Sequence, residues 1–370
     1  MTSTGLRTPT ATLATFGRLP DGREVPTILL TNAHGLSVRL IAYGAAVQSI
    51  MLPDRAGRMA DVVLGYATVG EYLAKPQYFG ATVGRFANRI ARGRFTIDGQ
   101  EYRTPVNDGG NALHGGAVGF DKVLWAVAEL RSDPAASVTM RYISRDGDQG
   151  YPGTMAVDAI YRLDDENRLS IEYRASTDRS TIVNITNHTY WNLAGEGSPA
   201  GAMGHLVTIP GESFLPTDAG AIPTGEFRPV QGTPFDFRTP RVISERVRDA
   251  GDQQLVFGRG YDHNWVIRRE VTPDLHLMAR LHDPSTGRGF ELASNQPGLQ
   301  FYSGNFLDGS SHGKTDRIYR GGDAIVLEPQ IFPDTPNQPA FGSAVLHAAE
   351  TYRNIIVYQF TVDGSLRSGG

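Results

Sequence analysis

The residues best suited to chemistry in this chain lie in the stretch Thr181–Ala194, T-I-V-N-I-T-N-H-T-Y-W-N-L-A. Its first half is β-branched, a composition typical of strands, and successive strand residues point to opposite faces. If the strand continues to its tyrosine, one face carries Asn184, Thr186, His188 and Tyr190. Such a face suits hydrogen bonding to hydroxyl groups and proton transfer by an imidazole. The alternative is a polar, solvent-facing surface with one hydrogen-bonded core histidine.

Glu328 is the second candidate. It follows the apolar run Ala324–Leu327, which predicts a buried strand, and it precedes Pro329. A carboxylate at the mouth of a buried strand is costly unless it is paired or has a function. The alternative is a salt bridge to one of the many arginines.

Three other stretches combine polar side chains with glycine or aromatic residues: 84–90 (G-R-F-A-N-R-I), 111–116 (N-A-L-H-G-G) and 260–265 (G-Y-D-H-N-W), with a related segment at 296–305. The two glycines after His114 let the backbone approach a ligand or another strand closely. The alternative is a tight turn beside a core histidine. Asp262 precedes an apolar strand, and its alternative role is to accept backbone hydrogen bonds in a loop.

Several familiar functional motifs are incomplete in this sequence or lack their structural context. The segment Gly309–Thr315 is one residue short of a phosphate-binding P-loop and has no strand–helix frame. Asp146 and Asp148 resemble the start of a calcium loop, but position twelve is Val157 instead of Glu. No H-E-x-x-H sequence occurs, and the G-x-S-x-G match within the same segment, Gly309–Gly313, lacks the strand–helix frame of a nucleophile elbow. We therefore expect no metal site and no nucleophile elbow.

Composition narrows the class of protein. The 370 residues carry 35 basic and 39 acidic side chains, scattered along the chain, for a net charge of −4, so we expect neither a nucleic-acid nor a membrane partner. The absence of cysteine excludes disulfides and thiol nucleophiles, and it fits a cytoplasmic protein. The Thr-rich start has no apolar signal-peptide core, and no run reaches the ~18 apolar residues that span a bilayer.

Most of the chain has the pattern of β-strands. Residues alternate in polarity over 138–142, 155–161 and 169–173, with turns between them, which predicts an antiparallel sandwich or barrel. Residues 95–102 read as a hairpin around Asp-Gly. Short helices are expected after Thr68, which has capping-box spacing, and over 244–249. We find no repeat or linker, and we expect a flexible tail over 1–14, a single domain over 15–364 and a second tail over 365–370.

Taken together and in this order, these stretches resemble the aldose 1-epimerase (galactose mutarotase) family. The resemblance covers about residues 29–360 and includes Gly119–Trp125 and Phe332–Asp334. It implies an all-β fold, one large antiparallel β-sandwich with a few short helices. It also implies an isomerase of carbohydrate metabolism that interconverts the α and β anomers of free aldoses such as galactose and glucose, and that needs no cofactor.

The resemblance also implies residue roles. Glu328 is the general base and His188 the general acid, and His114 assists as a hydroxyl or ring-oxygen ligand. The sugar-binding residues are Asn88, Arg89, His114, Tyr190, Asp262 and Gln300. The ring opens when the anomeric hydroxyl loses a proton while the ring oxygen gains one, and it recloses after rotation about C1–C2. From reference pKa values, we expect Glu328 to be ionised near neutral pH and His188 to supply the proton.

Three other functions stay open at this point. Asp262 and Glu328 would serve as the acid/base pair of a glycoside hydrolase. A non-catalytic carbohydrate-binding protein would keep the fold without turnover. Epimerisation of sugar phosphates would require a basic pocket, for which the arginines over 85–94 are available. The expected partner is a small monosaccharide, and the expected assembly is a monomer or homodimer.

Overall fold

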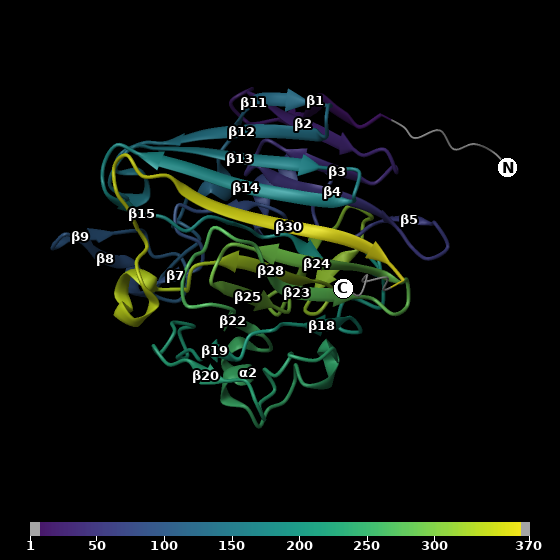
Figure 1. The fold of residues 1–370 in the computed structure, drawn as a ribbon. Helices are drawn as coiled ribbons and strands as arrows, with labels where there is room; N and C mark the ends of the chain where they lie inside the picture. The colour runs from purple at the N-terminus through teal and green to yellow at the C-terminus, as the bar shows by residue number, and fades with distance from the viewer. Residues whose placement is uncertain (1–7, 364–370) are drawn as a thin grey trace.

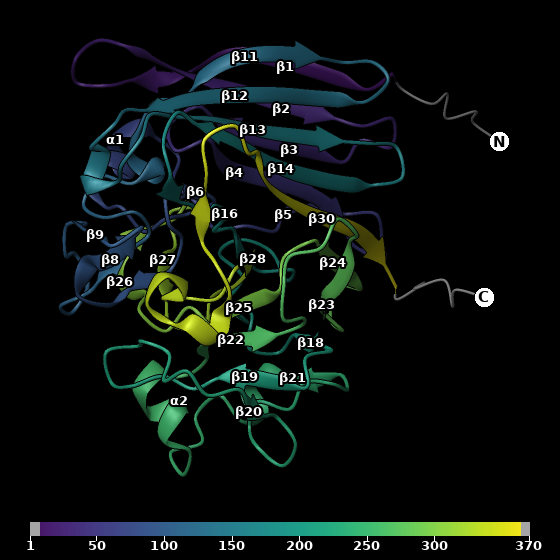
Figure 2. The ribbon, with the colours of Figure 1, turned by 60° about the vertical axis from the view of Figure 1, so that its left-hand side comes forward.

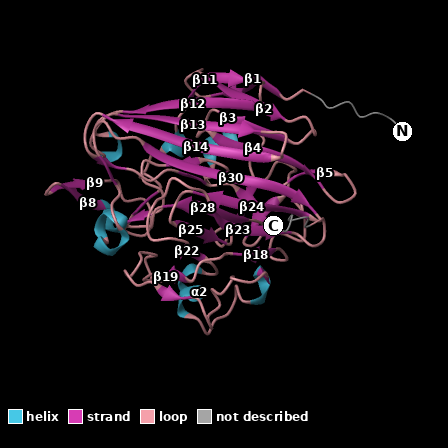
Figure 3. Cartoon of the chain, in the orientation of Figure 1, coloured by secondary structure: helices cyan, strands magenta, loops and turns pink. Residues whose placement is uncertain are grey.

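The computed structural model describes residues 8–363, and strands dominate it (Figure 3). A five-stranded antiparallel sheet comes first in the chain and is a simple meander, β1-β2-β3-β4-β5. Its strands are Thr10–Arg18, Glu24–Thr31, Ser37–Ile41, Ala46–Pro53 and Met59–Asp61.

The predicted tail over 1–14 is wrong for residues 10–14, because they belong to β1 and pair with β2. Thr10 stands opposite Thr31, and Leu13 stands opposite Ile28, which is fully buried. The part of that tail up to residue 7, and the tail predicted over 365–370, lie outside the described residues.

A nine-stranded antiparallel sheet forms the second layer, in the order β11-β12-β13-β14-β30-β24-β23-β18-β21 (Figure 1). Its strands, in that order, are Ala126–Arg131, Ala136–Ser144, Met155–Leu163, Arg168–Thr177, Tyr352–Val362, Arg288–Ser294, His276–His282, Leu206–Thr208 and Arg241–Val242. The last long strand of the chain, β30, pairs with β14 on one side and β24 on the other. It therefore joins the two halves of this sheet.

A six-stranded antiparallel sheet, β17-β28-β25-β22-β19-β20, carries four of the eight candidate site residues. Its strands are Tyr190–Trp191, Ile325–Gln330, Gly298–Tyr302, Asp262–Val266, Ser213–Leu215 and Arg228–Pro229. In Figure 2 this sheet lies below the five-stranded sheet and beside β24, β23 and β18 of the nine-stranded sheet. Trp191 packs against Phe290 of β24 and Tyr358 of β30, which fixes the first strand of this sheet on the nine-stranded sheet.

One continuous hydrophobic core joins the three sheets. It includes Ile28 of β2, Val138 of β12, Phe290 of β24, Trp265 of β22 and Leu327 of β28. The predicted all-β sandwich is confirmed. Because the core is continuous, we infer that the described residues from position 10 onwards form one domain.

Smaller elements complete the chain. The short strands are β6 (Thr82–Val83), β7 (Arg89–Ile90), β8 (Arg94–Ile97), β9 (Gln100–Arg103), β10 (Ala112–Leu113), β15 (Thr181–Ile182), β16 (Thr186–Asn187), β26 (Asp308–His312), β27 (Ile318–Arg320) and β29 (Val345–Leu346). Strands β8 and β9 form the predicted hairpin. Helix α1 (Val69–Ala74) begins at Thr68 with the predicted capping box.

The second helix prediction is wrong in position. Residues 243–245 form a single 3₁₀ turn, and the α-helix, α2 (Gln253–Gly258), begins later. Its N-cap is Asp252, whose carboxylate accepts the backbone N–H groups of Gln254 and Leu255. The capping signal of Asp252 decided the start, and the sequence analysis did not use it.

The stretch Thr181–Ala194 also differs from its prediction. It is not one strand: β15, β16 and β17 pair with β29, β6 and β28 respectively. Residues 181–193 are all buried, which contradicts the alternative of a solvent-facing surface. The polar side chains satisfy backbone groups of neighbouring segments, as when Thr186 donates to the carbonyl of Pro329. Among the described residues, no helix is long and apolar enough to cross a membrane.

The lysine of the segment that resembles a P-loop has a structural role. Lys314 lies between β26 and β27, and its ammonium donates to the carboxylate of Asp61 at 2.6 Å and to the carbonyls of Gln48 and Val63. Its side chain is 10% exposed. Lys314 therefore fixes this hairpin to the end of the five-stranded sheet.

We expect Lys314→Met to lower the free energy of unfolding by about 2–3 kcal/mol, because Asp61 and two carbonyls lose their donor in a buried place. Urea denaturation measures the change. Lys75→Met is the matched control, since Lys75 is exposed and donates to the carbonyl of Ser310 in the same hairpin. Its expected effect is below about 1 kcal/mol. Equal effects of the two substitutions would contradict the anchoring role.

Candidate active site

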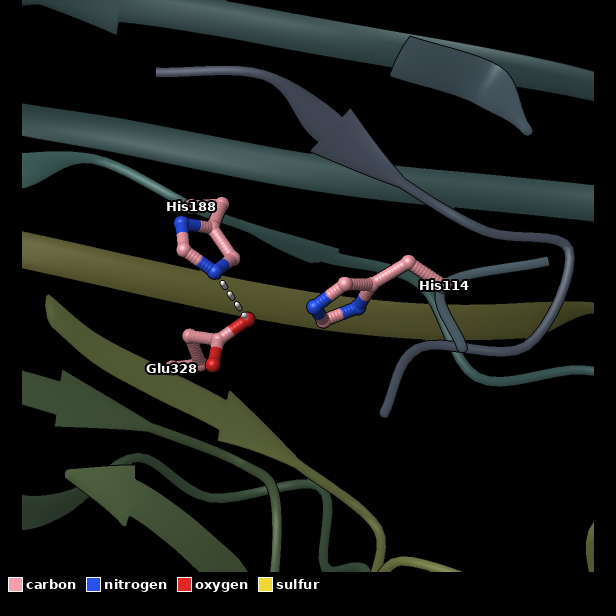
Figure 4. Close-up of side chains that lie close together, drawn as sticks. All are labelled: His114, His188 and Glu328. Carbon is pink, nitrogen blue, oxygen red and sulfur yellow. Dashed lines mark ion pairs between the residues drawn. The ribbon is translucent and has the colours of Figure 1, made fainter. Parts of the chain in front are cut away.

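Two histidines and one glutamate form a compact buried group (Figure 4). One ligand atom each from His114, His188 and Glu328 lies within 4.8 Å of the other two. The imidazole Nε2 of His188 is 4.0 Å from Oε1 of Glu328. The exposed fractions of the three residues are 5%, 5% and 2%. The structure therefore brings together the three residues expected to be catalytic.

Strand register explains the meeting of His188 and Glu328. Tyr190 of β17 pairs with Val326 of β28, so the same antiparallel register, carried two residues further, places His188 beside Glu328. Glu328 in turn pairs with Gln300 of β25. The backbone of His188 is held from its other side by Ala81, whose carbonyl accepts the His188 N–H at 2.9 Å.

The local backbone fixes the protonated nitrogen of His114. The N–H of Asn88 donates to Nδ1 of His114 at 3.1 Å, and the N–H of His114 donates to the carbonyl of Asn88. A backbone N–H can only donate, so Nδ1 carries a lone pair and the proton of the neutral ring is on Nε2. His114 therefore presents an N–H donor to the group in Figure 4.

The glycines after His114 allow a close approach of two backbone segments. Gly115 has φ +92°, and a Cβ at this position would lie 2.0 Å from the carbonyl oxygen of Gly84. The contact is with another part of the chain, which is one of the two uses that the sequence predicted. His114 and Asn88 themselves have positive φ, at +50° and +61°. The backbone at both His114 and Asn88 thus adopts a conformation that costs free energy.

Four more of the expected residues form a polar group beside the histidines. Arg89 donates from Nε to Asp108 at 2.8 Å, and one of its terminal nitrogens lies 3.7 Å from Asp262. Its backbone N–H donates to the side-chain oxygen of Asn88. Gln300 donates from Nε2 to Asp262 at 2.8 Å, and its Oε1 has no hydrogen-bond partner among the described residues. This group offers both donors and acceptors to a ligand rich in hydroxyls.

The burial of Glu328 is not balanced by an arginine. Within the range 8–363, His188 supplies the basic nitrogen within 4.0 Å of its carboxylate, so the alternative of an arginine salt bridge is wrong. Burial raises the pKa of Glu328 well above its usual value; the nearby Asp262 raises this pKa further, while Arg89 lowers it. The expectation of an ionised Glu328 near neutral pH rested on the reference pKa and left out desolvation, which favours the neutral carboxyl.

Burial has the opposite effect on the two imidazoles. It lowers the pKa of His188 to about 4 and the pKa of His114 well below its usual value. The expectation that His188 supplies the proton was likewise based on the reference pKa, whereas burial favours the neutral imidazole. For both groups, burial therefore favours the neutral form, in which the exchangeable acid proton of the pair is on the carboxyl of Glu328 and not on the imidazole of His188.

Two tyrosines contact the histidines. Tyr190 is buried, and its ring centroid lies 5.0 Å from that of His188. Tyr78, which the sequence analysis missed, lies 4.7 Å from His114 and 5.6 Å from His188 between ring centroids. Tyr78 lies in a connection that contains no motif indicating a functional residue. Pro76 and Gly80, which mark a turn, are the sequence features near it.

The donor set does not fit a metal ion. Two imidazoles and a carboxylate are suitable ligand types, but a histidine binds a metal through a lone pair and donates from its other nitrogen. In His114 the lone pair is already used to accept the Asn88 N–H, and Nε2 carries the proton. The ring therefore faces Glu328 and His188 as a donor instead of a ligand.

Comparisons with known proteins show the family of the whole chain. The family model described as aldose 1-epimerase matches residues 26–359. A galactose mutarotase of Sus scrofa is 42% identical over 351 residues, which cover 95% of this chain and 98% of that protein. An aldose 1-epimerase of Escherichia coli (strain K12) is 36% identical over 346 residues, covering 93% and 97%. The solved galactose 1-epimerase of Lactobacillus acidophilus NCFM superposes with a TM-score of 0.83 at 27% identity, covering 96% of this chain and 99% of that chain.

Because the pKa of Glu328 is raised in the folded protein, the free energy of unfolding should depend on pH. As the pH rises past the usual pKa of glutamate, the unfolded chain releases this proton before the folded protein does, so the parent loses free energy of unfolding until the raised folded pKa is passed. Glu328→Gln carries no such proton. We expect the variant to gain stability relative to the parent between about pH 4 and about pH 8, by roughly 1 kcal/mol or more.

Denaturant unfolding at the two pH values measures this difference. Glu270→Gln is the control, because Glu270 is exposed. A difference between Glu328→Gln and the parent that stays constant with pH would show that Glu328 titrates alike in the folded and unfolded chains.

Proposed function

The chain belongs to the aldose 1-epimerase family, and we propose that this mutarotase exchanges protons with free aldoses through Glu328 as general base and His188 as general acid. The activity is an isomerisation, the interconversion of the α and β anomers. The observation that carries the residue assignment is the 4.0 Å approach of the His188 imidazole to the Glu328 carboxylate inside a group of hydroxyl-binding side chains. Galactose and glucose are the proposed substrates.

The first step moves the shared proton. Hydroxyl groups of the sugar donate hydrogen bonds to Glu328, and such bonds favour the carboxylate and lower its pKa. The proton then lies on His188, where the new carboxylate stabilises the imidazolium. Sugar binding thus converts the neutral pair into the charged acid–base pair that the reaction needs.

The ring then opens and closes without any other reagent. Glu328 takes the proton of the anomeric hydroxyl, His188 gives its proton to the ring oxygen, and the C1–O5 bond breaks to leave an aldehyde. Rotation about C1–C2 presents the other face of the carbonyl. The reverse transfers reform the bond, so both side chains return to their starting states. Each positioned acid or base typically contributes ~10²–10⁴-fold.

The remaining polar residues hold the sugar during the rotation. Arg89 and the Nε2–H of His114 are donors, and Gln300 has a free acceptor atom among the described residues. Asp262 is held by Gln300 and lies beside Arg89, which suits an acceptor for sugar hydroxyls. Asn88 completes the group next to Arg89. Tyr190 lies beside His188 and supports its ring.

The arrangement favours this function over a glycoside hydrolase. A hydrolase would use Asp262 and Glu328 as its acid and base. Here the side chain of Asp262 is engaged by Gln300 and Arg89, and the group that faces Glu328 is His188. We further propose a cytoplasmic monomer or homodimer that acts in hexose metabolism on monosaccharides, supported by the absence of cysteine and the scattered charge.

Polarimetry on freshly dissolved α-galactose or α-glucose tests the function. The parent should accelerate the change in optical rotation, and Glu328→Gln should lose most of this activity, roughly 10²-fold or more, because an amide does not accept the anomeric proton. A parent without activity on either sugar would contradict the function. A Glu328→Gln variant within a few-fold of the parent would contradict the base assignment alone. Release of nitrophenol from nitrophenyl galactosides would indicate hydrolysis instead.

Substitutions of His188 and His114 should affect different kinetic constants. His188→Asn should lower kcat with little change in KM, because His188 donates its proton during the chemical step. His114→Asn should change kcat and KM together, because the Nε2–H of His114 is a ligand of the sugar in the ground state as well. Steady-state kinetics on one sugar measures both. The assignments would be exchanged if the His114 variant lost more kcat with an unchanged KM.

A further inference from the structure

Tyr78 occupies an unusual position for a tyrosine. It lies between α1 and β6 and has φ +60°, a left-handed conformation that is an outlier for a bulky side chain. Such strain persists only where the surrounding structure holds it, and it concentrates at functional sites. Tyr78 is half-buried, in contrast to the buried rings of His114 and His188 beside it. The role of the Tyr78 ring therefore depends on the contacts that the ring makes.

The backbone around Tyr78 is tied to His188. The N–H of Ala81 donates to the carbonyl of Tyr78, which closes a turn. At the end of this turn, Gly80 donates its N–H to the carbonyl of His188 at 3.0 Å, and Ala81 accepts the N–H of His188 at 2.9 Å. The position of Tyr78 is therefore fixed relative to the backbone of the proposed acid.

The ring of Tyr78 is also held by a neighbouring side chain. The ammonium of Lys122 lies 5.3 Å from the centroid of the Tyr78 ring, within the range of a cation–π interaction. Lys122 is in turn paired with the buried carboxylate of Asp121 at 3.1 Å. The tyrosine ring thus contacts a fixed cation as well as the two imidazoles, at 4.7 Å from His114 and 5.6 Å from His188.

We propose that Tyr78 is a positioning residue, whose ring covers His114 and His188, excludes water from them and fixes their orientation. This role rests on the proposed function of the two histidines. The neighbouring charged groups are Glu328 from β28, Arg89 from β7, Asp262 from β22 and Lys122 from the 3₁₀ turn at 120–122. Removal of the ring leaves these charges in place and changes the access of water.

The test compares Tyr78→Ala, Tyr78→Gly and Tyr78→Phe. Glycine adopts φ +60° without strain, so Tyr78→Gly deletes the ring while the turn is retained. Both ring deletions should lower kcat about tenfold or more with KM nearly unchanged, because misplaced catalytic groups slow the chemical step. Tyr78→Phe keeps the ring and should recover most of the lost kcat. Gln77→Ala, in the same connection, is the matched control.

A second measurement separates positioning from general damage. The pKa of His188, about 4 in the parent because of burial, should rise toward its usual value in Tyr78→Ala, as followed by NMR of the imidazole C–H signals. It should stay unchanged in Tyr78→Phe and Gln77→Ala. An unchanged kcat and unchanged histidine pKa in folded Tyr78→Gly would overturn the proposal, as would a rise in KM alone, which marks a sugar contact. The NMR result stands even if the parent shows no mutarotation.

Discussion

The structure depends on one costly placement, a glutamate in the middle of a buried strand with an imidazole, instead of an arginine, beside it. Desolvation raises the pKa of Glu328 and lowers the pKa of His188, so it favours the neutral form of both groups. An arginine at the same distance would fix Glu328 as a permanent carboxylate and make it a weak base. The neighbouring Arg89 is directed to Asp108 and Asp262 instead. The charges of the site are therefore arranged so that the proposed acid–base pair can still exchange its proton.

The fold meets this demand by joining segments that are far apart in the chain. His188 comes from an interrupted strand between two sheets, Glu328 from the six-stranded sheet, and His114 from a connection that reaches them through Asn88. Long strands supply the rigid layers, whereas the two histidines lie at short strands, His114 with a positive φ. This division is expected, because regular strands alternate their side chains too strictly to direct three of them at one point.

The sequence predicted the regular part of the molecule well. Alternating polarity was enough to identify β12, β13 and β14, and the capping box identified α1. The sequence also indicated His188 and Glu328 as candidate site residues, because burying a histidine or a carboxylate in apolar surroundings is costly unless the group is paired or has a function. It failed for β1, whose Thr-rich sequence lacks a hydrophobic signal, and for Tyr78, whose importance comes from tertiary contacts alone. The pKa shifts of Glu328 and His188 could not be predicted from sequence for the same reason, since desolvation depends on which segments cover the two groups.

Burial of the pair also gives a physical reason for the coupling of sugar binding and catalysis in the proposed mechanism. A charged His188–Glu328 pair without a ligand would face a desolvation cost that a 4.0 Å separation does not offset. A sugar brings several hydroxyl groups at once, and these solvate the carboxylate and imidazolium as water would. Under the proposed mechanism, a ligand with fewer or misplaced hydroxyls would leave the proton on Glu328 and the pair inactive. In this proposal, discrimination among ligands follows from the free energy of charging the pair, in addition to the proposed contacts of the sugar with Arg89, Asp262 and Gln300.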